Sequence, residues 1–388
     1  MGQVKILLGL AFCLALPVLP VREIMRNGVH NSVEMPTSDR LLGQGWWPTK
    51  GTPAREQYVG SAACGSCHKE KSGSQKTTPM AHAAMPAAAS GFLAGEPALT
   101  LPLDPYNYKI TQSDGKFFYS VRSGAGSASA SLLWAFGSGE AGQTYVYEKN
   151  GTFYESRLSY YTKPHALDLT AGHPHTTPEN LDAALGRPMA PGEARLCFGC
   201  HTTASTTHNR FDATRVIPGV SCEACHGPGD QHVAAMNLDP DGRGAKFITN
   251  PAALAPVDSV EFCGACHRTR WDVELSRAKG LEDVRFQGYR LETSKCFGNG
   301  DTRITCVACH DPHVPLVREA ASYDKNCLAC HAVKTATQKT AKQTAPACPV
   351  KNNDCVSCHM PKLDVSVMHS MFTDHRIRIV RIGEAFPE

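Results

Sequence analysis

The sequence predicts a fold of mostly short helices and loops packed around prosthetic groups, with a small antiparallel β subdomain inserted near its N-terminal end. Three observations lead to this fold class. The pattern Cys-x-x-Cys-His occurs seven times in 388 residues, long amphipathic repeats are absent, and the stretch between the first two copies is rich in aromatic and β-branched residues. The copies are Cys64-Cys67-His68, Cys197-Cys200-His201, Cys222-Cys225-His226, Cys263-Cys266-His267, Cys306-Cys309-His310, Cys327-Cys330-His331 and Cys355-Cys358-His359.

Each copy has the chemistry for covalent attachment of c-type haem. Two thiols three residues apart lie on one helical turn and can each bond one vinyl group at the same porphyrin edge, and the following histidine then reaches the iron. Zinc ribbons do not require a histidine after every second cysteine, and a thioredoxin-like site uses a single Cys-x-x-Cys. The sequence therefore predicts a multihaem cytochrome c with seven covalently bound haem c groups, numbered haem 1 to haem 7 in chain order. The motif cysteines are the attachment residues and the motif histidines are iron ligands.

The chain divides into five predicted segments. Residues 1–21 hold one lysine followed by an apolar run that includes Cys13, which is typical of a signal peptide, with an uncleaved anchor as the alternative. Residues 22–60 are polar and rich in Gly and Pro, and we expect an extended arm or linker in which Trp46-Trp47 could dock on a neighbouring subunit. Residues 61–100 carry haem 1, residues 101–163 form the β-rich insert, and residues 164–388 form a six-haem domain.

The β-rich insert contains two hairpin signals and one motif that resembles a nucleotide-binding loop. Asp114-Gly115 and Asn150-Gly151 lie where tight turns would join alternating strands. Residues 137–142 match G-x-G-x-x-G, but a dinucleotide site needs a helix after this loop, and the following residues have the pattern of a strand. The sequence therefore predicts hairpins here and no nicotinamide site.

The second iron ligand separates an electron carrier, in which protein fills both axial positions, from an enzyme, which keeps one position open. Ten histidines lie outside the motifs, enough to close every iron. His232 and His313 follow Gly- or Pro-containing turns after a motif, which direct them towards a neighbouring haem. His369 and His375 follow the last motif, and His173 and His175 precede haem 2. These six are the predicted second ligands, with His165 and His208 as weaker candidates.

Haem 1 has a different neighbourhood from the other haems. Met80 and His82 both follow its attachment site by about a dozen residues. We favour Met80 as its second ligand, with His82 as the alternative. A thioether ligand would raise the potential of that haem relative to haems with two histidines.

Several phrases resemble the multihaem cytochrome superfamily that includes pentahaem nitrite reductase, octahaem hydroxylamine oxidoreductase and their tetrahaem electron-transfer relatives. These phrases are YVGSAACGSCH, GVSCEACHGPGDQH, CVACHDPH, and CHMPK followed by FTDHRIR. The resemblance implies that His232 and His313 bind haems other than those of their own motifs. The Cys-x-x-Cys-Lys motif of the nitrite reductases is absent, which argues against nitrite reduction.

Two cysteines of the haem-rich part, Cys296 and Cys348, belong to no attachment motif. In an exported protein a leftover pair of thiols is most often a disulfide, so we predict this bridge, with a metal site or free thiols as alternatives.

These observations predict an exported electron carrier, periplasmic or extracellular. Covalent haem attachment occurs outside the cytoplasm, and a formal charge of +3 gives no reason to expect a nucleic-acid partner. The expected partners are redox proteins or a membrane electron-transfer complex. One alternative is a subunit that self-associates into an extracellular conductive filament. The other is an oxidoreductase of a small nitrogen or sulfur compound with one open haem.

Overall fold

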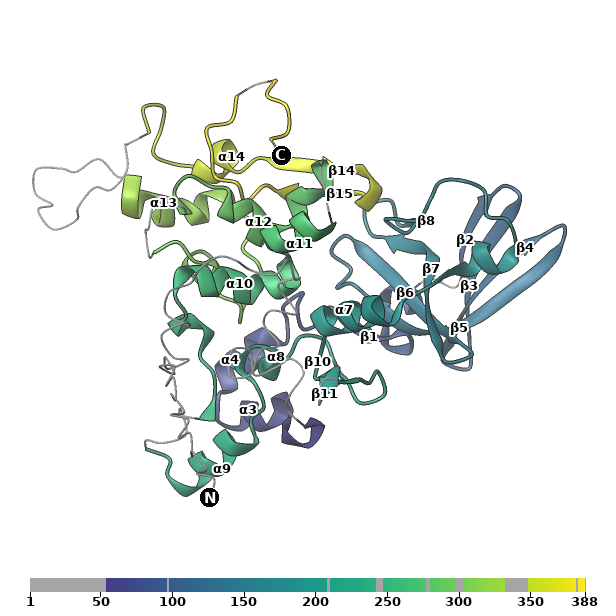
Figure 1. Cartoon of the computed structure of the whole chain (residues 1–388), viewed down its shortest axis with the longest axis horizontal. Coiled ribbons are helices and arrows are strands. Elements are labelled where there is room, and N and C mark those ends of the chain that lie inside the picture. The colour runs from purple at the N-terminus through teal and green to yellow at the C-terminus, as the bar shows by residue number, and fades with distance from the viewer. Residues whose placement is uncertain are drawn as a thin grey trace, which may run out of the picture.

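The computed structural model describes residues 54–95, 98–207, 210–241, 247–276, 280–297, 303–331, 348–381 and 383–387. The predicted signal peptide with Cys13, the arm as far as residue 53 with Trp46-Trp47, and His208 lie outside the described residues. The described chain forms two parts, a large sheet on one side and a column of short helices beside it (Figure 1).

The sheet has nine strands and is antiparallel throughout. Its strands are β1 (Ala84–Pro86), β2 (Ala98–Leu103), β3 (Tyr106–Ser113), β4 (Lys116–Ser123), β5 (Gly126–Phe136), β6 (Gly142–Lys149), β7 (Thr152–Tyr161), β8 (Ala166–Leu169) and β9 (Gly186–Pro188). The order is β2-β3-β4-β5-β6-β7-β8, with β1 paired to β5 and β9 paired to β7. The sheet curls so that β2 lies against β8.

The sheet is larger than the small subdomain expected within residues 101–163, so that part of the expected fold is wrong. Its outer strands β1 and β9 are three residues long and each ends in proline, and β8 has only four residues. Such short segments carry no alternating pattern, and they become strands only because a longer neighbour offers free backbone groups.

Both predicted hairpin turns are confirmed. Asp114 and Gly115 have φ of 51° and 72°, and Asn150 and Gly151 have φ of 52° and 77°. Two successive residues in the left-handed region define the tight turn that matches the twist of paired strands. The turns join β3 to β4 and β6 to β7, with Ser113 opposite Lys116 and Lys149 opposite Thr152.

The glycine-rich loop at residues 137–141 is also followed by a strand, as predicted. Gly137 and Gly139 have φ of 110° and 85°, and β6 begins at Gly142. A Cβ atom on Gly142 would lie 2.2 Å from the carbonyl oxygen of Tyr160, so glycine allows β6 to approach β7. The loop is a connection within the sheet.

The inside of the sheet is a core of aromatic and aliphatic side chains. Tyr108, Tyr119, Tyr145 and Tyr147 are almost completely buried there. Alternate residues of β3 and β4 point inwards, which is the pattern of a sheet with one buried face.

The rest of the described chain consists mainly of short helices. The α-helices are α3 (Ser61–Cys67), α4 (Lys69–Gln75), α5 (Gly91–Gly95), α6 (Leu181–Leu185), α7 (Pro191–His201), α8 (Cys222–His226), α9 (Asp230–Leu238), α10 (Pro256–His267), α11 (Arg270–Ser276), α12 (Gln287–Glu292), α13 (Asp324–His331) and α14 (Cys355–His359). The 3₁₀ helices are η1 (Arg55–Gln57), η2 (Ala87–Ala89), η4 (Pro251–Ala253), η5 (Leu281–Arg285), η7 (Cys306–Ala308), η8 (Ala320–Tyr323) and η9 (Ser366–Met368). Three two-stranded ribbons complete the fold, formed by β10 (Thr202–Thr203) with β13 (Ile217–Pro218), β11 (Thr206–Thr207) with β12 (Arg210–Phe211), and β14 (Lys362–Val365) with β15 (Ser370–Thr373).

Helix α7 joins the two parts. Phe198, in the middle of α7, is fully buried, and its ring lies 5.0 Å from Phe136, 5.3 Å from Trp134 and 5.6 Å from Phe153 of the sheet. The attachment site of haem 2 is thereby fixed to the sheet. None of the described helices is long and apolar enough to cross a membrane.

Candidate haem-binding sites

Six of the seven Cys-x-x-Cys-His motifs include an α-helix, and the seventh forms a 3₁₀ turn. They lie on α3, α7, α8, α10, η7, α13 and α14. On a helix, residues three apart lie on the same face, so each cysteine pair can meet one porphyrin edge as the sequence predicts.

Three motif histidines each lie opposite a histidine from another segment. The ring centres of His68 and His232 are 6.3 Å apart, with 19° between the ring planes. His226 and His313 are 6.0 Å apart at 23°. The third pair, His310 and His375, has a separation of 6.2 Å and an angle of 45°.

This separation is the one that an iron atom between two imidazoles requires. An imidazole nitrogen binds a metal at about 2 Å and lies roughly 1 Å from its ring centre, so two imidazoles on opposite sides of one metal have centres about 6 Å apart. The structure therefore brings three of the predicted second ligands, His232, His313 and His375, to positions that fit haem 1, haem 3 and haem 5.

The hydrogen bonds of these histidines leave the correct nitrogen for the iron. The Nδ1 atom of His226 donates to the carbonyl of Thr249 at 2.7 Å, and Nδ1 of His375 donates to the carbonyl of Thr373 at 3.0 Å. A carbonyl can only accept, so the proton is on Nδ1 and Nε2 has a free lone pair. The same arrangement holds for His201, His359 and His313, whose Nδ1 atoms contact Ala83 O, Arg378 O and Asp311 Oδ1.

Burial keeps the third pair uncharged. It lowers the pKa of His375 to about 4, and burial with the nearby His267 lowers the pKa of His310. Neutral imidazole is the form that binds a metal, so both rings have the required protonation state at neutral pH.

Four other candidate histidines make different contacts from these three pairs. The Nε2 atom of His173 contacts Glu155 Oε2 at 3.1 Å, and that of His369 contacts Asp168 Oδ2 at 2.8 Å beside the ring of Tyr161. Both contacts are with the sheet. His175 is exposed, and His165 Nδ1 lies 3.2 Å from the hydroxyl of Tyr160.

Neither sequence candidate for haem 1 occupies the position opposite His68, where the ring of His232 lies. His82 directs Nε2 to the carbonyl of Lys76 at 2.9 Å. The backbone carbonyl of Met80 accepts a hydrogen bond from Val220 at 2.9 Å, and its side chain is half-buried.

Attachment sites of different haems touch one another. The thiol of Cys64 lies beside that of Cys222, Cys263 beside Cys306, and Cys327 beside Cys355. These contacts join the sites of haems 1 and 3, haems 4 and 5, and haems 6 and 7.

Two of these pairs of sites also lie near a further site. The pKa of Cys263 is raised by the neighbouring Cys306, by burial and by the nearby Cys225 of haem 3. The pKa of Cys327 is raised by burial and by the nearby Cys309 of haem 5. Haem 2 attaches beside haem 4, because Cys200 Sγ lies 3.4 Å from the carbonyl of Ala265.

Carboxylates that accept hydrogen bonds from the backbone hold these segments together, and the sequence analysis missed them. Glu223, within the haem 3 motif, is 1 % exposed and accepts hydrogen bonds from the backbone of Val59, Gly60 and Gly229 at 2.8–2.9 Å. Asp324 accepts from the backbone of Asp354 and Cys355 at 2.6 and 2.8 Å. Nothing in the sequence distinguishes these acids from surface ones.

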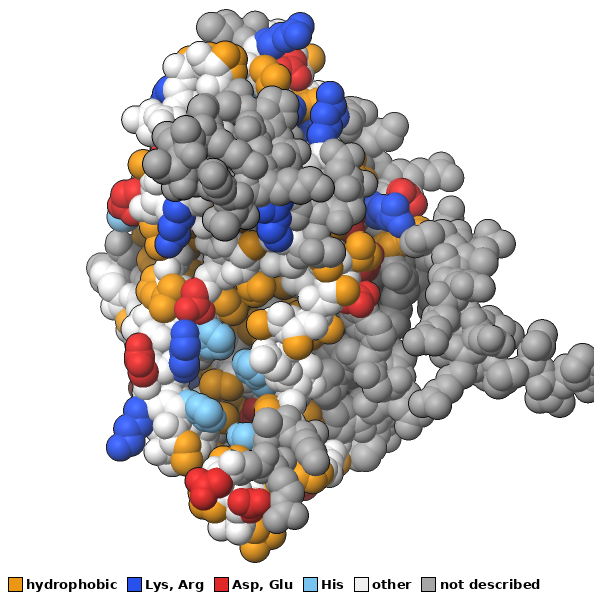
Figure 2. Space-filling model, turned by 90° about the vertical axis from the view of Figure 1, so that its left-hand side faces the viewer, with side chains coloured by type: hydrophobic (Ala, Val, Ile, Leu, Met, Phe, Trp, Pro, Cys, Tyr) orange, Lys and Arg blue, Asp and Glu red, His pale blue; other side chains and the backbone are white. Residues whose placement is uncertain are grey.

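The helical part fits a large apolar group because it has little core of its own. Among the described residues, α3, α9, α13 and α14 contain no buried side chain, and the buried apolar cluster on α10 contains only Phe262 and Ala265. Short helices without a packed face are unstable in water. Figure 2 shows histidines gathered in a hollow with hydrophobic side chains around it, which matches the needs of haem.

Cys296 and Cys348, the two described cysteines outside the motifs, form no disulfide in the structure. Cys348 is exposed, and the backbone amides of Lys351 and Val350 lower its pKa. The disulfide between Cys296 and Cys348 stays a prediction.

Comparison with known proteins agrees with this chemistry. A family model described as cytochrome c554 and c-prime matches residues 155–227, which include the motifs of haems 2 and 3. The chain is 25% identical over 228 residues to the multiheme cytochrome MtrA of Shewanella baltica (strain OS185), covering 54% of this chain and 57% of that protein. The crystal structure of the outer cell wall cytochrome OcwA aligns with 84% of this chain and 80% of its own, at 15% identity and a TM-score of 0.40.

The repeated attachment motifs, the family model and the match to MtrA define the class of protein. The chain is a multihaem c-type cytochrome with covalently bound haem. It spans little more than half the length of the MtrA protein that it matches.

Proposed function

We propose that this chain is an exported cytochrome with seven haems that carries electrons along a row of closely spaced haems. The observation that carries the proposal is that cysteines of different attachment sites lie close together. Bound haem supplies an iron that takes up and releases one electron. The chain supplies spacing, axial ligands and exclusion of water.

The contacts support one order. They run from haem 1 through haem 3, haem 4, haem 5 and haem 6 to haem 7, with haem 2 beside haem 4. Haem 1 is then at one end of the row, as we expect from the long insert that follows its motif.

The paired histidines support closed irons. We assign His232 to haem 1, His313 to haem 3 and His375 to haem 5. The assignment for haem 1 replaces Met80 with an imidazole. An iron held by two imidazoles has no free position for substrate, which favours an electron carrier over an enzyme.

Two measurements test the proposal on purified holoprotein. Mass spectrometry under denaturing conditions should give seven haems per chain, because thioether bonds survive unfolding. Cyanide added to the oxidised protein should leave the visible spectrum unchanged. A high-spin band that cyanide removes would reveal an open iron and would instead favour the oxidoreductase.

Partners and location are part of the same proposal. We propose transfer between redox partner proteins, or to a membrane electron-transfer complex, in the periplasm or outside the cell. Self-association into a filament is a separate outcome, which size-exclusion chromatography of the mature protein would reveal.

A further inference from the structure

We propose that the buried ion pair of Arg290 and Asp374 is a positioning device that sets the axial geometry of haem 5 and haem 7 together. The inference rests on the proposed ligation of haem 5 by His375. It assigns a redox role to two residues that contact no haem iron.

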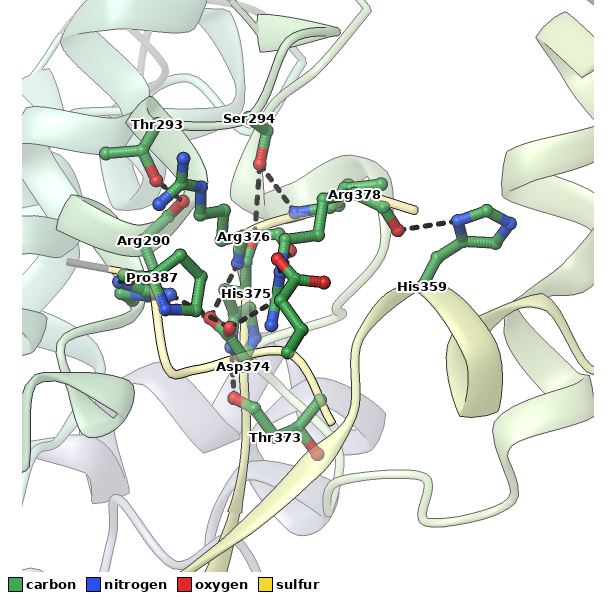
Figure 3. A network of polar contacts seen from close by, with 12 residues as sticks. Arg290, Thr293, Ser294, His359, Thr373, Asp374, His375, Arg376, Arg378 and Pro387 are labelled. Atoms are coloured by element: carbon green, nitrogen blue, oxygen red, sulfur yellow. Dashed lines mark hydrogen bonds and ion pairs between the residues drawn. The ribbon is translucent and has the colours of Figure 1, made fainter. Parts of the chain in front are cut away.

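The ion pair is completely buried and bidentate. Arg290 Nε lies 2.8 Å from Asp374 Oδ1, and Arg290 Nη2 lies 2.9 Å from Asp374 Oδ2. Both side chains are 0 % exposed. The same carboxylate accepts from the backbone N–H of Arg376 at 3.0 Å and from Nη1 of Arg378 at 2.7 Å (Figure 3).

The pair fastens an irregular segment to α12. Residues 374–378 belong to no helix or strand, so no regular series of backbone hydrogen bonds holds them in place. Ser294, just after α12, donates to the carbonyl of His375 and accepts from the N–H of Ile377 at 2.8 Å. Arg290 also donates to the carbonyl of Pro387 at 2.8 Å and lies 4.5 Å from the ring centre of Phe386.

The fastened segment serves two haem sites at once. His375 directly follows Asp374 and lies opposite His310 of haem 5. Four residues after Asp374, the carbonyl of Arg378 accepts from Nδ1 of His359, the motif histidine of haem 7, at 2.7 Å. A displacement of this segment would move a ligand of haem 5 and change the hydrogen bond that orients a ligand of haem 7.

Stability alone is a weak reason for such a pair. Burial removes both ions from water, and replacing a buried pair with apolar residues is often neutral or stabilising. The two parallel hydrogen bonds instead fix the orientation of Asp374 relative to Arg290, because a guanidinium group binds a carboxylate in one plane. Two further donors on the carboxylate extend that geometry to the next four residues.

The experiment uses electron paramagnetic resonance of the oxidised holoprotein, because low-spin ferric signals depend on the angle between the two axial imidazoles. The signal of haem 5 should differ from those of haems 1 and 3, since its rings are 45° apart and theirs are 19° and 23° apart. Asp374→Asn should shift this signal and the midpoint potentials of two haems, with haem content unchanged. Arg290→Lys, which keeps the charge and loses the fork, should shift the same signals less.

Asp364→Asn, an exposed residue of the neighbouring β14, is the matched control and should match the wild type. His375→Ala should make one haem high-spin. If it leaves every haem low-spin, the ligation of haem 5 is wrong. If it opens one haem while Asp374→Asn and Arg290→Lys keep wild-type signals and potentials, the positioning role is wrong. Equal shifts in the signals and potentials of all haems in Asp374→Asn and Arg290→Lys would also contradict the positioning role.

Discussion

At the scale of single residues, the described histidines fall into two groups according to which ring nitrogen makes a hydrogen bond. His226, His313 and His375 donate Nδ1 to an oxygen and leave Nε2 free, whereas Nε2 of His173 and His369 contacts a carboxylate. The sequence could predict the first group only in part. A turn after a motif shows that a histidine leaves its own haem, but its destination depends on how the segments pack.

Haem 1 illustrates this limit. Met80 is close to Cys67 in sequence, but His232 arrives from the segment after the haem 3 motif. We predict that His232→Ala makes one haem high-spin and able to bind cyanide. Met80→Ala should keep every haem low-spin, and the wild type should lack the near-infrared band of a thioether–iron bond. The opposite result for the two variants would restore Met80 as the ligand.

Glu223 offers a second prediction at this scale. Its carboxylate accepts hydrogen bonds from three backbone N–H groups, those of Val59 and Gly60 just before the haem 1 segment and that of Gly229, three residues before His232. Glutamine has one accepting oxygen, so Glu223→Gln should leave donors unpaired and lower the free energy of unfolding by about 1–3 kcal/mol. The low-spin signal of haem 1 should shift as well.

The control for Glu223 is Glu70→Gln, a change at an exposed residue of α4. Thermal unfolding followed by circular dichroism, with the resonance spectrum of each variant, checks both effects. Equal stability and equal spectra for the two variants would contradict the role of Glu223.

At the scale of elements, local chemistry predicted the hairpins but not the extent of the sheet. Asp-Gly and Asn-Gly specify their turns through residues that tolerate positive φ. Strands β1 and β9 depend on pairing with β5 and β7, which lie far away in sequence. Their assignment needs the tertiary fold, which no local pattern contains.

The second hairpin turn gives a prediction for an element. Gly151 has a φ of 77° with open space around it, so Gly151→Val introduces backbone strain without a clash. We expect a loss of about 1–2 kcal/mol in the free energy of unfolding. Gly124 is also a turn residue in open space, but its φ is not positive. Gly124→Val should therefore lower the free energy of unfolding much less. Equal melting temperatures for the two variants would be evidence against the turn.

The contact between α7 and the sheet leads to another prediction for an element. Phe198 is fully buried among aromatic rings, and Phe198→Ala should cost about 3–5 kcal/mol. It should also loosen the site of haem 2 and broaden the low-spin signal of one haem. Phe247→Ala, at a side chain that is 47% exposed, is the matched control. Similar unfolding curves for both would show that α7 is not anchored through Phe198.

At the scale of the whole molecule, the haem sites and the helices depend on each other. The sequence predicted short helices and loops around prosthetic groups, because this follows from the motifs and from the absence of long amphipathic repeats, and the number of seven haems stays a prediction. The order of the sites could not be read from the chain, since Cys64 of the first motif lies beside Cys222 of the third. His232, His313 and His375 lie in segments that follow other motifs, so the sites interlock.

The most direct test of this account is a structure of the mature holoprotein with its haems in place. We predict seven haems, with haem 1, haem 3, haem 4, haem 5, haem 6 and haem 7 in contact or near contact in that order and haem 2 beside haem 4. The irons of haems 1, 3 and 5 should be bound by His232, His313 and His375. A haem isolated from the row, or an open iron at any of these three sites, would contradict the account.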